Sequence, residues 1–182
     1  MHLLIGGDGL VGTALRAEFI ARGLDWSASS RREKFATTPE WPQRLFLELT
    51  EPLPDSLPFA NVVYLSAACP KFADCEGNAM SWVVNVDAPI ALARHYAALG
   101  TFVVFISSDA VEWCGMTAYG RQKTMVEAFM HTIDAAIMRP SRILPANASQ
   151  FASEVVELGL SRKAGVTRWW HDDKKVLKKT VA

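Results

Sequence analysis

The sequence has no apolar run long enough to cross a bilayer. Its longest runs, such as Phe102 to Ile106, are short, whereas a transmembrane helix needs about 20 apolar residues. It also has no net charge, because 19 lysines and arginines balance 19 aspartates and glutamates. This neutrality removes any overall electrostatic attraction to nucleic acid or to an anionic membrane. We therefore expect neither a nucleic-acid partner nor a membrane partner.

Cysteine is scarce as well, with only Cys69, Cys75 and Cys114 in the chain. An odd and sparse set of this kind is typical of a reducing compartment rather than of a disulfide framework. The spacing of the cysteines fits no zinc pattern and the four histidines are scattered, so we expect no metal site. The amino terminus enters an apolar segment without a basic leader or a cleavage site. These features predict a cytoplasmic protein.

Apolar segments alternate with segments of helical periodicity along the chain. The predicted strands are residues 3–6, 24–29, 44–49, 61–68, 101–107 and 134–140, and the predicted helices are 10–22, 79–99, 119–131 and 148–160. Several strands are apolar on both faces, as in a parallel sheet that is covered on each side. This alternation predicts an α/β fold, a doubly wound parallel sheet of six to seven strands with helices on both faces.

The length of 182 residues suits one domain, which we assign to residues 1–182. Within it, residues 145–182 form a short C-terminal segment for substrate or interface contacts. The connection KFATTPEWPQ, residues 34–43, has two prolines and is predicted to lack a helix.

Glycines are clustered where the first strand meets the first helix. Gly6, Gly9 and Gly12 form G-x-x-G-x-x-G, and Leu10 and Val11 lie between the last two. Without side chains the backbone can turn sharply and approach a pyrophosphate, which the positive end of the helix then faces. The motif therefore predicts nucleotide binding by these five residues. An ordinary tight turn is the alternative.

Charged residues near this loop bear on which nucleotide is bound. Asp8 lies inside the loop, where its carboxylate would repel a pyrophosphate unless it points outward. At the end of the second strand, where an acidic residue would bind the ribose of NAD, the sequence has Arg31 and Arg32. Guanidinium groups pair well with a 2′-phosphate. We therefore favour NADP over NAD, and a basic surface turn is the alternative.

A second group of residues has the composition of a proton-transfer site. Ser107 and Ser108 end the fifth strand, and Tyr119 and Lys123 are four residues apart, on one face of the predicted helix. A lysine ammonium there would lower a phenol pKa that starts near 10. Tyr119 could then exchange a proton with a substrate oxygen that a serine hydroxyl holds. An ordinary helix surface is the alternative for the Tyr/Lys pair.

Taken in order, these motifs carry a family resemblance. The set GGDGLVG, SSRR, LSAA, CEGNAMSWVVNVDAP, FISSDAV, YGRQK and MRPSRI resembles the extended branch of the short-chain dehydrogenase/reductase superfamily, over roughly His2 to Val176. It is most similar to dTDP-4-dehydrorhamnose reductases and sugar-nucleotide epimerases. The resemblance implies a Rossmann domain that binds NADP, with Ser108 polarising a substrate carbonyl and Tyr119 as acid/base. It also implies that Lys123 binds the nicotinamide ribose.

The resemblance implies further roles. Asn85 would anchor a proton relay, Ala67 and Ala68 would line the cofactor, and the segment from Pro140 to Arg142 would lie beside the carboxamide. Compared with the extended branch, this chain has a shorter segment between the serine and the tyrosine and a reduced C-terminal substrate lobe.

The leading hypothesis is an NADPH-dependent reductase that acts on a carbonyl of a small or sugar-like molecule. Two alternatives stay open at this point: an NAD(P)-dependent epimerase or dehydratase, and a non-catalytic NADP-binding regulatory module. Relatives in the superfamily often pair through helices that flank the active site, so a homodimer is the expected oligomer.

Overall fold

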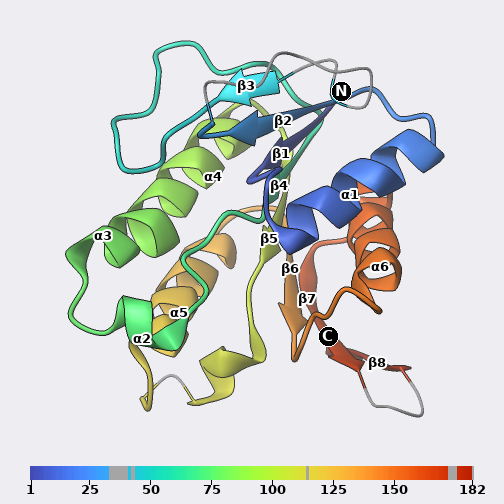
Figure 1. The fold of residues 1–182 in the computed structure, drawn as a ribbon. Helices are drawn as coiled ribbons and strands as arrows, with labels where there is room; N and C mark the ends of the chain where they lie inside the picture. The colour runs from blue at the N-terminus through green and yellow to red at the C-terminus, as the bar shows by residue number, and fades with distance from the viewer. Residues whose placement is uncertain (33–40, 42–43, 114, 172–175, 182) are drawn as a thin grey trace.

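A single sheet of eight strands organises the fold (Figure 1). The structure is a computed structural model that describes residues 1–32, 41, 44–113, 115–171 and 176–181. The strands are β1 (His2–Ile5), β2 (Trp26–Ser30), β3 (Arg44–Phe46), β4 (Val62–Leu65), β5 (Phe102–Ile106), β6 (Ala135–Pro140), β7 (Gly165–His171) and β8 (Val176–Val181).

The strand order is β3-β2-β1-β4-β5-β6-β7-β8. All pairs from β3 to β7 are parallel, and β8 is antiparallel to β7. The chain adds β2 and β3 on one side of β1 and the later strands on the other, so the order reverses between β1 and β4. Ligands of doubly wound sheets bind outside the carboxyl ends of the strands at such a reversal. The predicted doubly wound parallel sheet is thus confirmed, with seven parallel strands.

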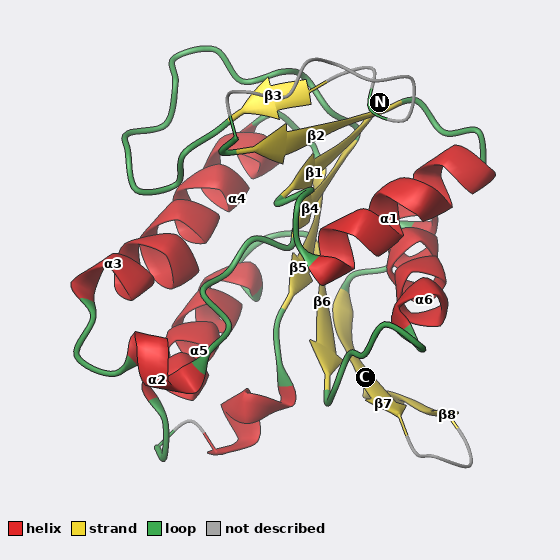
Figure 2. Cartoon of the chain, viewed as in Figure 1, coloured by secondary structure: helices red, strands yellow, loops and turns green. Residues whose placement is uncertain are grey.

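Helices cover both faces of the sheet, as Figure 2 shows. On one face α1 (Leu10–Ala21) lies beside α6 (Ala148–Ser161), and on the other α4 (Ala88–Ala98) lies beside α5 (Ala118–Met130). Each face has its own apolar core. The first core includes Leu15 and Phe19 of α1, and the second includes Leu92 of α4 and Val126 of α5. Strands with buried residues on both faces, such as β5, follow from this sandwich.

The predicted helix over residues 79–99 divides into three parts in the structure. It begins as α3 (Ala79–Trp82), continues as the π-helical turn η1 (Val83–Asp87) and ends as α4. The short helix α2 (Phe72–Cys75) precedes it, and the 3₁₀ turn η2 (Asp109–Trp113) follows β5. Single π turns within helices are often found at functional sites, and this one contains Asn85.

The C-terminal segment differs from the prediction. The predicted strands end at residue 140, whereas the structure adds β7 beside β6 and then β8, so this segment extends the sheet. Trp169 of β7 is 2% exposed and packs edge-on against Phe151 of α6, with ring centroids 5.1 Å apart. Trp169 therefore belongs to one core, and the partly buried Val166 of the same strand packs against the other.

Most of the predicted helix-free connection, residues 34–43, lies outside the described residues. Among the helices that the structure describes, none is both long and apolar enough to span a membrane.

Candidate active site

The glycine loop folds back tightly under the start of α1. Gly6 has a φ of +99°, in the region that favours glycine, and a Cβ added to it would lie 2.7 Å from the backbone nitrogen of Ala67. A Cβ on Gly12 would lie 2.0 Å from the carbonyl oxygen of Gly6. By contrast, no described atom lies within 4 Å of a Cβ added to Gly9. Gly6 and Gly12 thus permit the tight turn, and Gly9 leaves open space above it.

The N-terminus of α1 opens into that space. Gly9 is the N-cap residue and gives α1 no side-chain cap, and the first turn of this fully described helix has no acidic residue. Leu10 is exposed and Val11 is half-buried at its start. The first N–H groups of a helix have no partner within the helix, so they attract anions. An uncapped helix end beside an open glycine fits a pyrophosphate.

Arginines gather at the end of β2, next to this loop. Arg31 and Arg32 are both exposed, and Arg44 of β3 reaches the same place, since its Nη2 donates to Ser30 Oγ at 2.6 Å. Asp8 lies here as well and accepts a hydrogen bond from Ser30 Oγ at 2.5 Å. The carboxylate therefore points toward the end of β2.

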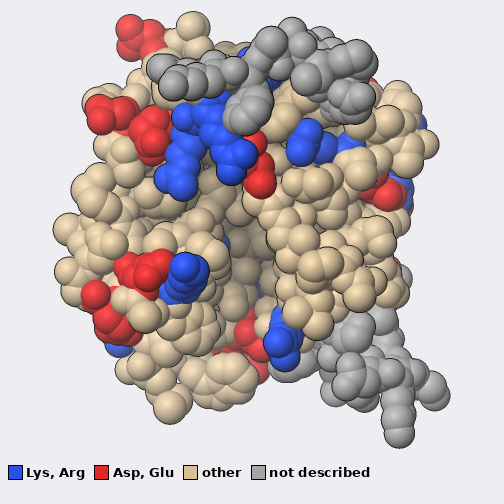
Figure 3. Space-filling view, in the orientation of Figure 1, with Lys and Arg blue, Asp and Glu red and all other residues tan. Residues whose placement is uncertain are grey.

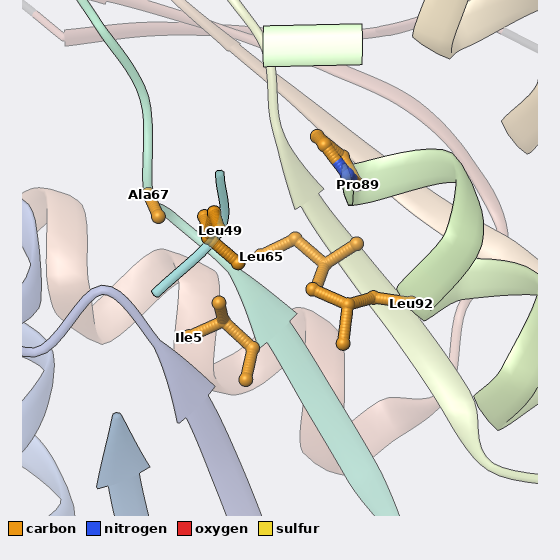
Figure 4. A pocket seen from close by; sticks show the side chains of 6 residues that line it. All are labelled: Ile5, Leu49, Leu65, Ala67, Pro89 and Leu92. Atoms are coloured by element: carbon orange, nitrogen blue, oxygen red, sulfur yellow. The ribbon is translucent and has the colours of Figure 1, made fainter. Parts of the chain in front are cut away.

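Ala67 and Ala68 follow β4 and are half-buried. Ala67 donates its N–H to the carbonyl of Ile5, which joins the ends of β4 and β1. It also lines a small apolar pocket at this edge of the sheet, with a cavity volume of about 10 Å³ (Figure 4). The pocket residues are Ile5, Leu49, Leu65, Ala67, Pro89 and Leu92. A single water molecule needs about 10–15 Å³, so this pocket is too small for any part of a nucleotide.

Ser108 lies in the turn that follows β5. Its Oγ accepts the N–H of Ala110 at 3.1 Å and donates to Asp109 Oδ1 at 3.3 Å. Burial raises the pKa of the Asp109 carboxyl above its ordinary value, although the hydrogen bond from Ser108 opposes this. The neighbouring Ser107 is buried and donates to Glu127 Oε1 at 2.5 Å, so of the two serines Ser108 is the one nearer the open edge.

Tyr119 and Lys123 lie one turn apart on α5. Tyr119 is 8% exposed and clusters with Ala110, next to Ser108. Phe72 of α2 stacks on its ring, with centroids 5.4 Å apart and planes at 29°. The Lys123 Nζ lies 5.7 Å from the centroid of the Tyr119 ring and donates to the carbonyl oxygen of Ile106 at 2.9 Å. The structure thus brings the predicted serine, tyrosine and lysine together at the carboxyl end of β5.

The predicted effect of Lys123 on the phenol is wrong. Burial raises the pKa of Tyr119 well above its ordinary value, and nearby Cys75, Asp109 and Cys69 raise it further. Burial also lowers the pKa of Lys123 to about 8, because the low-dielectric interior disfavours an ammonium. The lysine is directed at a backbone carbonyl rather than at the phenol. Desolvation is therefore the main cause of both pKa shifts, whereas the spacing alone suggested that the lysine would lower the pKa of the phenol.

Asn85 is buried in η1 and joins two segments of the site. Its Nδ2 donates to the carbonyl of Cys69 at 3.0 Å and to Gln122 Oε1 at 2.7 Å, while its Oδ1 accepts the N–H of Cys69 at 2.7 Å. Gln122 in turn donates to Ser81 at 2.9 Å. These bonds tie the loop after β4 to α5. They give Asn85 a positioning role, and the proton relay stays a prediction.

An ion pair that the sequence analysis missed lies beside Lys123. Glu127, one turn further along α5, is 4% exposed and receives hydrogen bonds from the guanidinium of Arg139 and from Ser107. The spacing of Tyr119, Lys123 and Glu127 at every fourth residue was the available signal. Arg139 precedes Pro140, which is buried at the carboxyl end of β6. The pair therefore fixes α5 against the strand ends.

The face that contains these residues is hollowed. Figure 3 shows a depression down its middle, between α1 on one side and the helices from α2 to α5 on the other, with basic side chains gathered over β2 and β3. The glycine loop lies at this edge of the sheet and Tyr119 lies on α5 beside it. A parallel sheet with a glycine-rich loop at its reversal point defines a doubly wound, Rossmann-type α/β protein.

The chain belongs to a particular family within that class. The family model described as "RmlD substrate binding domain" matches residues 1–169. The resemblance to the dTDP-4-dehydrorhamnose reductases of the extended short-chain dehydrogenase/reductase branch is thereby confirmed. A comparison with curated proteins gives no match.

Solved structures share the fold at low sequence identity. A hypothetical dTDP-4-dehydrorhamnose reductase from Sulfolobus tokodaii is 20% identical with a TM-score of 0.73, over 92% of this chain and 76% of that one. The enzyme WbmG from Bordetella bronchiseptica, in complex with NAD and UDP, is 17% identical with a TM-score of 0.71, over 92% and 71%. A dTDP-4-dehydrorhamnose reductase from Bacillus anthracis, in complex with NADP, is 15% identical with a TM-score of 0.67, over 92% and 73%. This chain thus spans about three quarters of each neighbour.

Proposed function

We propose that this protein is an NADPH-dependent reductase that reduces a carbonyl of a small or sugar-like substrate, with Tyr119 as the proton donor. The observation that carries this proposal is that Tyr119 packs against Ala110, whose N–H donates to Ser108, while Lys123 donates to the carbonyl of Ile106 at the carboxyl end of β5. That place lies on the same sheet edge as the open N-terminus of α1. Oxygen-polarising, proton-donating and nucleotide-binding groups therefore share one edge.

The cofactor part of the proposal rests on the glycine loop and on the arginines next to it at the end of β2. Gly6, Gly9 and Gly12 with the first turn of α1 would hold the pyrophosphate, and Arg31 and Arg32 would pair with a 2′-phosphate. NADP in the Bacillus anthracis neighbour and NAD in the Bordetella bronchiseptica neighbour support this class of ligand. When bound, the reduced cofactor supplies the hydride.

The proton step is assigned from the environment of the phenol. The Tyr119 hydroxyl carries a proton at neutral pH even at the ordinary phenol pKa near 10, and burial raises the pKa further. A protonated phenol can donate to a carbonyl oxygen as that oxygen gains charge, which is the proton step that a reduction needs. Ser108 would donate a second hydrogen bond to the same oxygen. Lys123, whose Nζ lies 5.7 Å from the centroid of the Tyr119 ring, would bind the nicotinamide ribose.

The substrate part of the proposal comes from the mouth of the site and from the neighbours. Phe72, Trp113 and Met116 are exposed near Tyr119 and η2. Apolar side chains of this kind can pack against the ring faces of a sugar. The UDP in the Bordetella bronchiseptica neighbour supports a nucleotide-linked sugar as the first candidate to assay.

The experiment compares Tyr119→Phe with Tyr96→Phe, a matched control whose hydroxyl is bound to the carbonyl of Pro58. NADPH binding is followed by fluorescence, and turnover is followed by NADPH consumption with a panel of aldehydes, ketones and keto sugars. We expect Tyr119→Phe to abolish turnover and to bind NADPH as the wild type does, and Tyr96→Phe to keep both. Retained turnover in Tyr119→Phe would remove the phenol from the reaction.

A second candidate, an epimerase or dehydratase, is favoured by one observation. Asp109 has a raised pKa and lies beside Ser108, so the site holds a second group suited to proton transfer. Such an enzyme would retain its nucleotide through purification and convert a sugar nucleotide without net consumption of NADPH. Saturable NADPH binding with no turnover of either kind would instead favour the regulatory module.

A further inference from the structure

A carboxylate from the glycine loop lies at the end of β2, and β2 itself ends in Ser30 rather than in an acidic residue. The last residue of β2 is Ser30, where dinucleotide-binding sheets usually carry the acid that binds the ribose hydroxyls. Asp8 comes from the glycine loop, and its Oδ2 accepts the Ser30 hydroxyl at 2.5 Å. The Ser30 oxygen also accepts the N–H of Arg32 at 3.0 Å. The loop thus delivers to this place the functional group that β2 lacks.

The same carboxylate engages an arginine. The Nη2 of Arg44 lies 3.6 Å from Asp8 Oδ1 and donates to Ser30 at 2.6 Å. The guanidinium of Arg44 also stacks over Trp41, 4.4 Å from the ring centroid, and Arg16 approaches that ring to 4.0 Å. The side chains of Asp8 and Arg44 are only 26% and 11% exposed, so solvent screens their attraction incompletely. Arg44 is therefore held in place with its charge largely balanced.

These contacts bear on the choice between a ribose hydroxyl and a ribose phosphate. A carboxylate accepts hydrogen bonds from the 2′-hydroxyl of NAD, whereas it repels the 2′-phosphate of NADP. Arginines at the same place attract the phosphate. With Asp8 present, the charge of Arg44 is partly balanced, and the exposed Arg31 and Arg32 also lie at the end of β2.

We propose that Asp8 is a specificity-determining residue, which weakens the preference for NADP by placing its carboxylate at the end of β2 and by pairing with Arg44. This inference rests on the proposed nucleotide-binding function. On this inference, the preference between NADP and NAD depends on the balance between the Asp8 carboxylate and the arginines. Removing the carboxylate would then release Arg44 for the 2′-phosphate.

The test measures the binding of two cofactor fragments by isothermal titration calorimetry. The probes are 2′,5′-ADP, which carries the 2′-phosphate, and 5′-AMP, which carries the hydroxyl. The variants are Asp8→Asn, which keeps the hydrogen bond to Ser30, and Asp25→Asn. Asp25 is a matched control, because it is an exposed acid just before β2, at the opposite end of the strand.

We expect Asp8→Asn to raise the ratio of 2′,5′-ADP affinity to 5′-AMP affinity about tenfold, which corresponds to about 1.4 kcal/mol. Asp25→Asn should leave the ratio within about twofold of the wild type, because salt screens charges separated by more than a Debye length. The double variant Asp8→Asn/Arg44→Gln should lose the gain, since Arg44 is the residue that is released. Thermal melting of each variant without ligand checks that it is folded.

Several results would overturn the inference. An unchanged ratio in Asp8→Asn, or an equal rise in Asp25→Asn, would remove the specific role of Asp8. A double variant that keeps the gain would refute the release of Arg44. If the wild type bound neither fragment and neither NADPH nor NADH, the proposed function itself would fail. If the wild type bound them and Asp8→Asn left the ratio unchanged, this inference alone would fail.

Discussion

Replacing Lys123 by methionine should make the protein more stable at neutral pH. Burial lowers the pKa of Lys123 from its ordinary 10.5 to about 8. A difference of one in pKa corresponds to about 1.4 kcal/mol, so burying the ammonium costs about 3 kcal/mol below pH 8. Methionine has a similar unbranched shape and no charge. The variant loses the hydrogen bond to the carbonyl of Ile106, which contributes about 1 kcal/mol. The expected net gain is about 2 kcal/mol in the free energy of unfolding.

The pH dependence of this gain follows from the same pKa. Below about pH 8, Lys123 is protonated in both the folded and the unfolded protein, and the full cost is present. Between about pH 8 and 10.5 the unfolded chain binds the proton more strongly, so the stability of the wild type rises with pH relative to the variant. Above pH 10.5 the cost is gone, and the lost hydrogen bond should leave the variant slightly less stable.

Urea unfolding of both proteins at a series of pH values measures this difference. Groups that titrate in the same range and lie away from Lys123 are common to both proteins and cancel in the comparison. A variant that was less stable than the wild type at pH 7 would refute the reasoning, as would a difference that stayed constant from pH 8 to 10.5. The Lys123→Met variant should also bind NADPH more weakly than the wild type. This combination is expected of a buried lysine that serves cofactor binding at a cost in stability.

Three other perturbations test the site. Gly12→Ala should destabilise the fold by about 2 kcal/mol or more in urea unfolding, because its Cβ would meet the Gly6 carbonyl oxygen at 2.0 Å. Gly9→Ala, whose Cβ meets no described atom within 4 Å, should not, and equal losses would contradict this account. Glu127→Gln should cost about 3 kcal/mol because it leaves Arg139 partly buried without its counter-charge, whereas the exposed Glu157→Gln should change stability by less than about 0.5 kcal/mol. Phe72→Ala should expose the phenol of Tyr119 and lower the pKa of Tyr119 toward 10. Tyrosinate absorbance would detect one tyrosine that titrates at a lower pH than in the wild type. An unchanged titration curve would show that Phe72 does not shield Tyr119.

Much of the fold was predictable because its signals are local. Apolar strands alternate with helical periodicity, and this alternation predicted the seven-stranded parallel part of the sheet except for β7 itself. The terminal strands were missed, because β7 and β8 are recognisable chiefly through their pairing with β6 and with each other. The π turn at Asn85 was missed as well, since the same residues fit an uninterrupted helix.

The residues of the candidate site were likewise predictable only where their signals are local in the sequence. The glycine spacing and the Tyr119/Lys123 spacing are properties of consecutive residues, so the sequence predicted both the loop and the shared helix face. The buried pair of Glu127 with Arg139 joins a helix to a strand, and only Glu127 had a signal in the sequence, one turn beyond Lys123. Trp41 had none, since its contact with the glycine loop exists only in the folded chain.

The amino-acid sequence by itself determined the order of the first six strands and of the main helices, the glycine loop and the spacing of Tyr119 and Lys123, because each depends on neighbours within a few positions. Tertiary structure alone decided the direction of the pKa shifts at Tyr119 and Lys123, because desolvation depends on what the fold packs around a side chain. It also decided that Asp8 meets Ser30 and Arg44, three residues that the chain separates and that the carboxyl ends of β1 and β2 and the start of β3 bring together.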